Sequence, residues 1–134
     1  MGYTHYLDQS TDIRNLAQWR KFAKLVQNIL DYNKDIITGW DGEPDTEIIV
    51  NDNEISFNGI TADAHETCSI KRSPADEFEF CKTAYKPYDK VVVAIYKLYE
   101  MMFKDVTFSS DGEDSDHEEG EDLLNSFIAQ RYRR

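Results

Sequence analysis

Residues 87–104, PYDKVVVAIYKLYEMMFK, decide the fold class, because they can be interpreted as a strand or as a helix. The run Val91-Val92-Val93 alone favours a strand, since β-branched side chains are enriched there. Over the whole stretch, however, apolar residues recur every three or four positions, which is the spacing of one helix face. Pro87 suits a first helical turn, and the Asp89 carboxylate suits the positive end of the helix dipole. We predict a helix over 88–104, and the valines leave its start open.

A second long helix is predicted over residues 11–31. Ser10-Thr11-Asp12 offers a side-chain N-cap and a first-turn acid, and apolar residues then recur at helical spacing as far as Leu30. Between the two helices, TEIIV and EISFNG flank Asn51-Asp52-Asn53, a combination typical of a hairpin. Further strands are expected near residues 3–7, 66–71, 77–83 and 106–110, and a short helix over 121–132.

The predicted order of elements is β-α-β-β-β-β-α-β-α. Strands that gather between two long helices are typical of the α+β class. We predict a mainly antiparallel sheet of about five or six strands, with the two long helices packed on one face and a short C-terminal helix. At 134 residues, the chain is expected to form a single domain over 1–134.

The net charge of −11 is concentrated in one segment. Residues 111–122, DGEDSDHEEGED, contain eight acids and neither Lys nor Arg, so all other residues together carry only −3. Such tracts are usually solvated, and we expect residues 113–120 to be flexible. The spacing does not fit a calcium loop, because Asp116 and Asp122 stand where Gly and Glu are needed. Basic residues form no patch outside RYRR at 131–134, which disfavours direct nucleic-acid binding.

Neither a membrane span nor a leader is predicted. The sequence lacks an apolar run of the roughly 18 residues that a span needs, and MGYTHYLDQS does not have the pattern of a signal peptide. We expect a cytoplasmic protein without membrane contact. Cys68 and Cys81 have no metal-ligand spacing, so we expect two reduced, half-buried thiols rather than a disulfide. Cys81 could act as a nucleophile only beside a base.

Polar side chains crowd into residues 80–89, FCKTAYKPYD, between a predicted strand end and a predicted helix start. Unpaired N–H groups and the positive dipole end at a helix start suit an anion. Lys82 and Lys86 would add positive charge, whereas Asp89 would oppose an anion. The alternative interpretation is a plain helix entry, with solvated lysines and with Tyr88 packed as a staple.

Other polar residues fall within predicted strands or at their ends, where they could converge on one edge or face of the sheet. Several are residue types used for acid–base chemistry or metal binding. A zinc site from His5, His65 and Cys81 lacks a diagnostic spacing, and we predict neither a metal site nor a cofactor. The predicted ligand-binding residues are His5, Tyr6, Asn58, His65, Glu66, Lys82, Thr83, Lys86, Tyr88 and Asp111.

Five segments follow one another along the chain in a recognisable order. They are GYTHY at 2–6, ISFNG at 55–59, HET at 65–67, FCKTAYKPYD at 80–89 and SSDG at 109–112. Together they resemble the motif set of a family of small proteins found in tailed phages and prophages. The resemblance implies a phage source and a shared site, but no particular reaction. Cys68 departs from the pattern, in which an aromatic residue is more frequent, and the acidic tract is longer than usual.

Three functions follow from these features. The first is a phage accessory protein, for host takeover or anti-defence, that binds a small phosphorylated or nucleotide-like ligand. Lys82, Thr83 and Lys86 would then hold phosphate. The second is a small enzyme on such a ligand, with His5 or His65 as the base and Glu66 or Asp111 as its partner. The third is an acidic, protein-binding inhibitor that mimics nucleic acid toward a host protein.

Binding of a small anionic ligand is favoured over the other two functions. Polar residues at several strand ends favour a ligand over a host protein as partner. The sequence contains neither a recognised nucleophile–base motif nor a Gly-rich phosphate loop, which leaves binding ahead of catalysis. The oligomeric state is left open, and a phage-encoded protein would act in the host cell cytoplasm.

Overall fold

The computed structural model describes residues 3–44, 46–73 and 78–132, and it has an α+β fold with antiparallel sheets. This confirms the predicted class. The elements follow in the order β1 (Thr4–Gln9), α1 (Leu16–Tyr32), β2 (Ile37–Thr38), β3 (Ile49–Val50), β4 (Glu54–Gly59), η1 (Thr61–Asp63), β5 (Cys68–Lys71), β6 (Phe78–Lys82), α2 (Asp89–Met102), β7 (Val106–Ser110), η2 (Asp114–His117) and α3 (Glu118–Tyr132).

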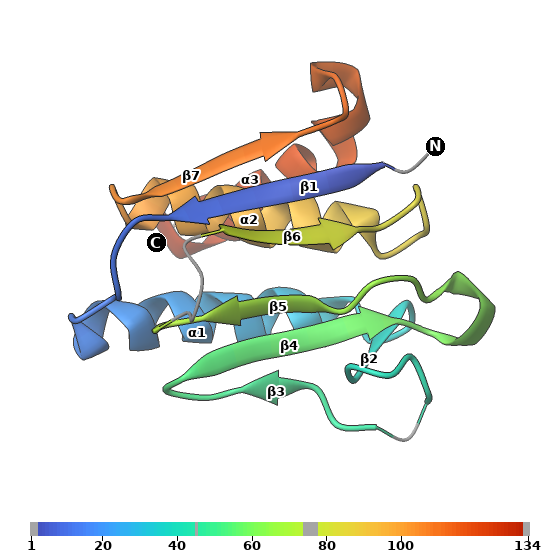
Figure 1. Ribbon diagram of the computed structural model, residues 1–134, viewed down its shortest axis with the longest axis horizontal. Helices are drawn as coiled ribbons and strands as arrows, with labels where there is room; N and C mark the ends of the chain where they lie inside the picture. The colour runs from blue at the N-terminus through green and yellow to red at the C-terminus, as the bar shows by residue number, and fades with distance from the viewer. Residues whose placement is uncertain (1–2, 45, 74–77, 133–134) are drawn as a thin grey trace.

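The strands form two sheets instead of the single sheet that we predicted. One has three strands in the order β6-β1-β7, and the other has four, with β2, β3 and β5 all paired to β4. Strands β5 and β6 lie side by side at the junction (Figure 1). Glu66 N–H donates to Lys82 O at 3.1 Å, but the Lys82 N–H returns to the Glu66 side chain at 2.7 Å. A side chain thus satisfies the Lys82 N–H, and β5 and β6 belong to separate sheets.

The helices lie behind the strands in Figure 1, with α2 and α3 behind β1 and β6, and α1 behind β4 and β5. Helix α2 has the bounds Asp89–Met102, close to the predicted 88–104. Its three consecutive valines are fully buried. Burial of successive positions is explained by the place of α2, which packs against both α3 and the sheet. The strand-like run Val91-Val92-Val93 therefore belongs to a helix that is covered on more than one side.

Helix α1 begins at Leu16, later than the predicted residue 11. The Asn15 side chain accepts the Gln18 N–H at 3.0 Å and acts as the N-cap. The preceding residues are held elsewhere, because Ser10 N–H donates to Asp105 O and Ile13 N–H donates to Arg72 O. Tertiary hydrogen bonds therefore keep Ser10-Thr11-Asp12 out of the helix.

Helix α3 has 15 residues and is not the short helix that we predicted. Its first turn carries acidic residues, which suit the positive end of the dipole. Gly120 allows a close approach to α2, since a Cβ atom there would lie 2.5 Å from Val93 Cγ1. The extra turn of α3 comes from residues that we had assigned to the acidic tract.

The acidic tract, expected to be flexible at 113–120, contains η2 and the start of α3. His117 and Gly120 are buried, whereas the acidic side chains from Glu113 to Glu119 are exposed. The mobility of this segment stays a prediction, which a deletion would test. The two buried residues give a physical reason to expect a cost from such a deletion.

The core is rich in aromatic side chains. Trp19 and Phe22 of α1 pack against Tyr99 of α2, and Phe22 also meets Phe103. The cysteines belong to this core as free thiols, fully buried rather than half-buried. Among the described helices, none combines the length and the apolar character that crossing a bilayer requires.

Candidate functional site

A partly buried carboxylate, that of Asp89, organises the region where β1 meets the start of α2. His5 of β1 is fully buried, and its Nε2 lies 2.6 Å from Asp89 Oδ1. The Thr83 hydroxyl donates to the same oxygen at 2.5 Å. Since an ionised carboxylate only accepts hydrogen bonds, His5 Nε2 carries the hydrogen. The other ring nitrogen, Nδ1, is buried and has no hydrogen-bond partner.

Two further side chains surround the His5 imidazole. The Tyr3 ring lies edge-on to it at a centroid distance of 4.8 Å, and the His117 ring lies at 5.7 Å. Tyr3 Oη and His117 Nε2 are also buried without hydrogen-bond partners. Burial, and next the charge of Asp89, raise the pKa of Tyr3, which keeps its hydroxyl protonated. Burial, together with His5 and Lys97, lowers the pKa of His117.

Tyr85 covers this group from the solvent side. Its ring is exposed and stacks on Tyr3 at a centroid distance of 3.8 Å. Ala84 and Tyr85 have φ angles of 52° and 60°, in the left-handed region that residues with a Cβ rarely adopt. Two such residues in succession store backbone strain, which is frequent at functional sites.

The ten predicted site residues do not form one cluster. His5 and Thr83 share Asp89, as described above. Tyr6 alternates with His5 along β1 and so points to the opposite sheet face, where its hydroxyl donates to Asp111 at 3.0 Å. The sheet therefore separates these two pairs.

A third group joins the end of β4 to β6. The Asn58 side chain bonds the backbone of Trp40, Gly59 and His65, which satisfies its amide within the fold. The hydroxyl of Tyr88, which is fully buried, donates to Glu66 O at 2.6 Å. His65 is exposed, and Lys82 and Lys86 are half-buried. These contacts hold the loop that follows β4 and give Asn58 and Tyr88 a structural role.

The predicted site residues leave out four members of the His5 group, namely Tyr3, Tyr85, Asp89 and His117. From the sequence, Asp89 was considered for its effect on the helix dipole. In the structure, its carboxylate accepts hydrogen bonds from Thr83 and His5. His117 was included in a tract expected to be solvated. The signal that could have marked it is a lone histidine among eight acids, because a purely solvating tract does not need an imidazole.

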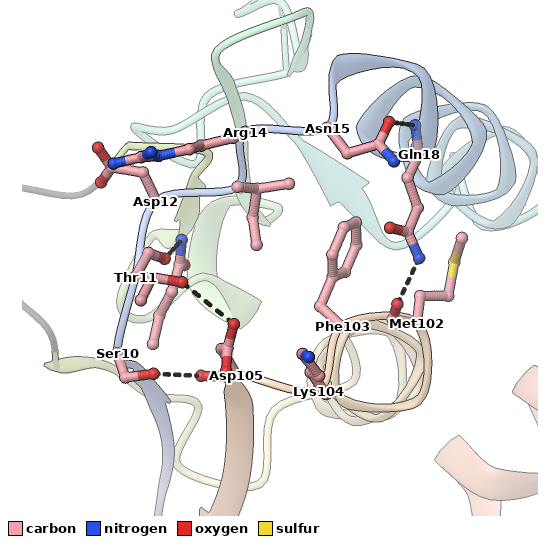
Figure 2. Close-up of a pocket in the computed structure, with 12 residues that line it drawn as sticks. Ser10, Thr11, Asp12, Arg14, Asn15, Gln18, Met102, Phe103, Lys104 and Asp105 are labelled. Atoms are coloured by element: carbon pink, nitrogen blue, oxygen red, sulfur yellow. Dashed lines mark hydrogen bonds between the residues drawn. The ribbon is translucent and has the colours of Figure 1, made fainter.

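An open pocket of about 840 Å³ lies at the opposite end of β1. Figure 2 shows Ser10, Thr11 and Asp105 on one side of it, and Asn15, Gln18, Met102 and Phe103 on the other. Hydrogen bonds fix both sides. The hydroxyls of Ser10 and Thr11 donate to Asp105, and Gln18 Nε2 donates to Met102 O at 2.6 Å. None of the ten predicted residues lines this pocket.

The described part of the chain contains no cluster of three metal ligands. Across residues 3–44, 46–73 and 78–132, no three or more His, Cys, Asp or Glu side chains are grouped so that they could hold a metal ion. The combination of His5, His65 and Cys81 therefore has no structural support. The Cys81 thiol faces the Glu66 carbonyl oxygen at 3.5 Å, and burial raises the pKa of the Cys68 thiol.

Comparisons of the chain with protein-family models, curated proteins and solved structures give no match. The resemblance to phage and prophage proteins therefore stays an expectation from the sequence.

Proposed function

We propose that the protein binds a small phosphorylated or nucleotide-like ligand in the open pocket between the 10–15 segment and the α2–β7 turn, without converting it. The observation that supports this proposal is the size and lining of the pocket. At about 840 Å³, its volume lies within the range of small-molecule sites. Its walls are already ordered by internal hydrogen bonds, which lowers the entropy cost of binding.

The lining offers groups for each part of such a ligand. Ile13, Met102 and Phe103 are apolar and could contact a base. The side chains of Arg14 and Lys104 are cationic and exposed, and they suit a phosphate.

Helix α1 begins at the pocket. Gln18 N–H is capped by Asn15, and the earlier N–H groups of the first turn have no partner within a helix. The positive dipole end would add to the attraction for an anion. Asp12 and Asp105 oppose it, although Asp105 Oδ2 accepts a hydrogen bond from the Thr11 hydroxyl at 3.2 Å. The mixed lining favours a ligand with a neutral ring and few charges over a bare polyphosphate.

The sequence resemblance suggests how such binding could be used. A phage accessory protein that removes a host signalling nucleotide from solution needs tight binding and no catalytic step. This role is part of the proposal, and it extends the preference for binding drawn from the sequence.

Isothermal titration calorimetry with nucleoside mono- and diphosphates, cyclic nucleotides and inorganic phosphate tests the proposal. Arg14→Ala and Lys104→Ala should each weaken the best ligand by roughly 10- to 150-fold, the cost of one charge-assisted hydrogen bond. Lys24→Ala is the matched control, because Lys24 is an exposed lysine of α1 outside the pocket. If no ligand of this panel binds, or if both pocket variants bind like the control, the proposal is wrong.

A small enzyme is the second candidate, and the His5–Asp89 pair favours it. A carboxylate that orients an imidazole at 2.6 Å is an arrangement used in general base catalysis. The partner is Asp89 rather than Glu66 or Asp111. Full burial of His5 means that a substrate could reach Nδ1 only if the side chains around it moved. Mass spectrometry of nucleotides incubated with the protein and with His5→Gln would reveal a product formed only by the unaltered chain.

A further inference from the structure

Three unpartnered buried atoms mark a place in the fold that the proposed ligand pocket does not use. They are Tyr3 Oη, His5 Nδ1 and His117 Nε2, and among the described residues Tyr96 Oη is a fourth such atom. Buried polar atoms are almost always hydrogen-bonded, and each exception needs an explanation. Three of the four exceptions belong to neighbouring side chains, because both the Tyr3 and the His117 rings contact the His5 ring. One small ion or molecule bound between these side chains would give all three atoms a partner.

The His5 imidazole is held as a metal ligand would be. In metal sites, a histidine commonly donates its second ring N–H to a carboxylate, which fixes the tautomer and the ring orientation. His5 Nε2 makes that contact with Asp89 at 2.6 Å, and Thr83 in turn orients Asp89. In the neutral ring, the lone pair of Nδ1 is then left for an electrophile.

The spacing of the two histidines suits one ion. Metal–nitrogen bonds of about 2.0–2.1 Å place an ion about 3.2 Å from a ring centre, so two rings on one ion lie at most about 6.4 Å apart. The His5 and His117 centroids are 5.7 Å apart, with an interplanar angle of 55°. His5 is fully buried and His117 is 6% exposed, so the bound ion or molecule must be small.

The charges around the histidines favour a cation. The carboxylate of Asp89 contacts His5 directly, and Asp116 adjoins His117 in the sequence. Glu121 follows one turn later in α3. Lys97, a positive side chain whose charge acts on His117, is paired with Glu121 at 2.5 Å. A cation therefore meets a net negative surrounding at this end of β1.

We propose that His5 Nδ1 and His117 Nε2 bind one divalent transition-metal ion of the zinc, cobalt and nickel class. Imidazole nitrogens prefer these borderline ions to magnesium or calcium. Water would complete the coordination, and the Tyr3 hydroxyl would donate a hydrogen bond to that water. The ion would join η2 to β1 and would thereby hold the acidic segment against the sheet.

Zinc and cobalt titrations of the full chain, prepared free of metal, test this site. Zinc should raise the melting temperature, and cobalt should give the absorption bands of a nitrogen-ligated ion. His117→Gln should lower the affinity at least tenfold. The matched control is His65→Gln, since His65 is exposed and is the third of only three histidines. It should bind like the unaltered chain.

A measurement on the unaltered chain covers the case in which His117→Gln fails to fold. In nitrogen-15 NMR, zinc should shift the ring nitrogens of His5 and His117 and leave those of His65 unchanged. Absence of stoichiometric binding, unchanged affinity in His117→Gln, or loss of binding in His65→Gln would overturn the proposal. In that case an ordered water molecule, and not a metal ion, would be bound between these side chains. Nucleotide binding in the pocket is measured in a separate experiment, by calorimetry, so the two proposals can fail independently.

Discussion

At the scale of single residues, the Asp89 carboxylate accepts hydrogen bonds from both His5 and Thr83 at one oxygen. Its position in the first turn of α2 was predictable from the sequence, since Pro87 and the apolar spacing locate the helix start. Its two partners were not predictable, because His5 is 84 residues away and no local pattern links them. Sequence reasoning therefore recovered the element that carries Asp89 but not the contacts that it makes.

Replacing Asp89 with Ala should destabilise the fold by about 2–4 kcal/mol, because two buried donors lose their acceptor. Urea unfolding monitored by circular dichroism measures the change. Asp8→Ala is the matched control, because Asp8 is an exposed carboxylate on β1, and it should change the free energy of unfolding by less than about 0.5 kcal/mol. Equal effects of the two substitutions would mean that Asp89 does not support His5.

His117 should make the protein less stable as the pH falls below about 6.5, the ordinary pKa of histidine. Burial lowers its pKa in the folded state, so the unfolded chain binds more protons in this range. Stability then rises with pH and is lost on acidification. In the presence of a chelator, melting temperatures of the unaltered chain should therefore fall more steeply between pH 7 and pH 5 than those of His117→Gln. A parallel decline in both proteins would show that other groups dominate.

At the scale of elements, the helical spacing of apolar residues in α2 outweighed the strand preference of its valines. The valine run of α2 is strand-like in isolation, but the apolar spacing over the whole stretch predicted the helix that is observed. The start of α1 was missed, because the backbone of Ser10 and Ile13 bonds distant carbonyl groups. The length of α3 was missed, because an acidic composition suggested solvation while Gly120 and His117 face the core.

Gly120 tests how closely α3 must approach α2. An Ala substitution in a helix normally stabilises it by about 0.5–1 kcal/mol. Here the new Cβ would lie 2.5 Å from Val93 Cγ1 and 3.1 Å from the Lys90 carbonyl oxygen. Gly120→Ala should therefore destabilise the fold by about 1–3 kcal/mol.

A double mutant isolates the cause of this effect. In a Val93→Gly background, Gly120→Ala should cost clearly less, because both Val93 atoms that the new Cβ would meet, Cγ1 and Cβ, are gone. Thermal unfolding of the four proteins measures the coupling. If Gly120→Ala stabilises the unaltered chain, the helices have room to separate and the close contact does not limit stability.

At the scale of the whole molecule, two sheets share one layer of helices but are joined by few contacts between β5 and β6. The antiparallel α+β class could be predicted, because it follows from the order of strands and helices. The division into two sheets could not, since no local pattern shows how residues 16 positions apart meet at the junction. Glu66 supplies both a backbone and a side-chain contact to Lys82 at the junction.

Glu66 should therefore control the integrity of the junction. In Glu66→Ala, the Lys82 N–H loses its 2.7 Å acceptor in a half-buried position, which should cost about 1–3 kcal/mol. Glu66→Gln keeps an oxygen at the same place and should retain most of the stability. Hydrogen exchange at the Lys82 amide reports directly on its hydrogen bond to the Glu66 side chain. The exchange should accelerate in the alanine variant only. Glu47→Ala, at an exposed glutamate away from the junction, controls for the loss of charge. If exchange at Lys82 accelerates equally in Glu66→Gln, the charge of Glu66, rather than its hydrogen bond, holds the two sheets together.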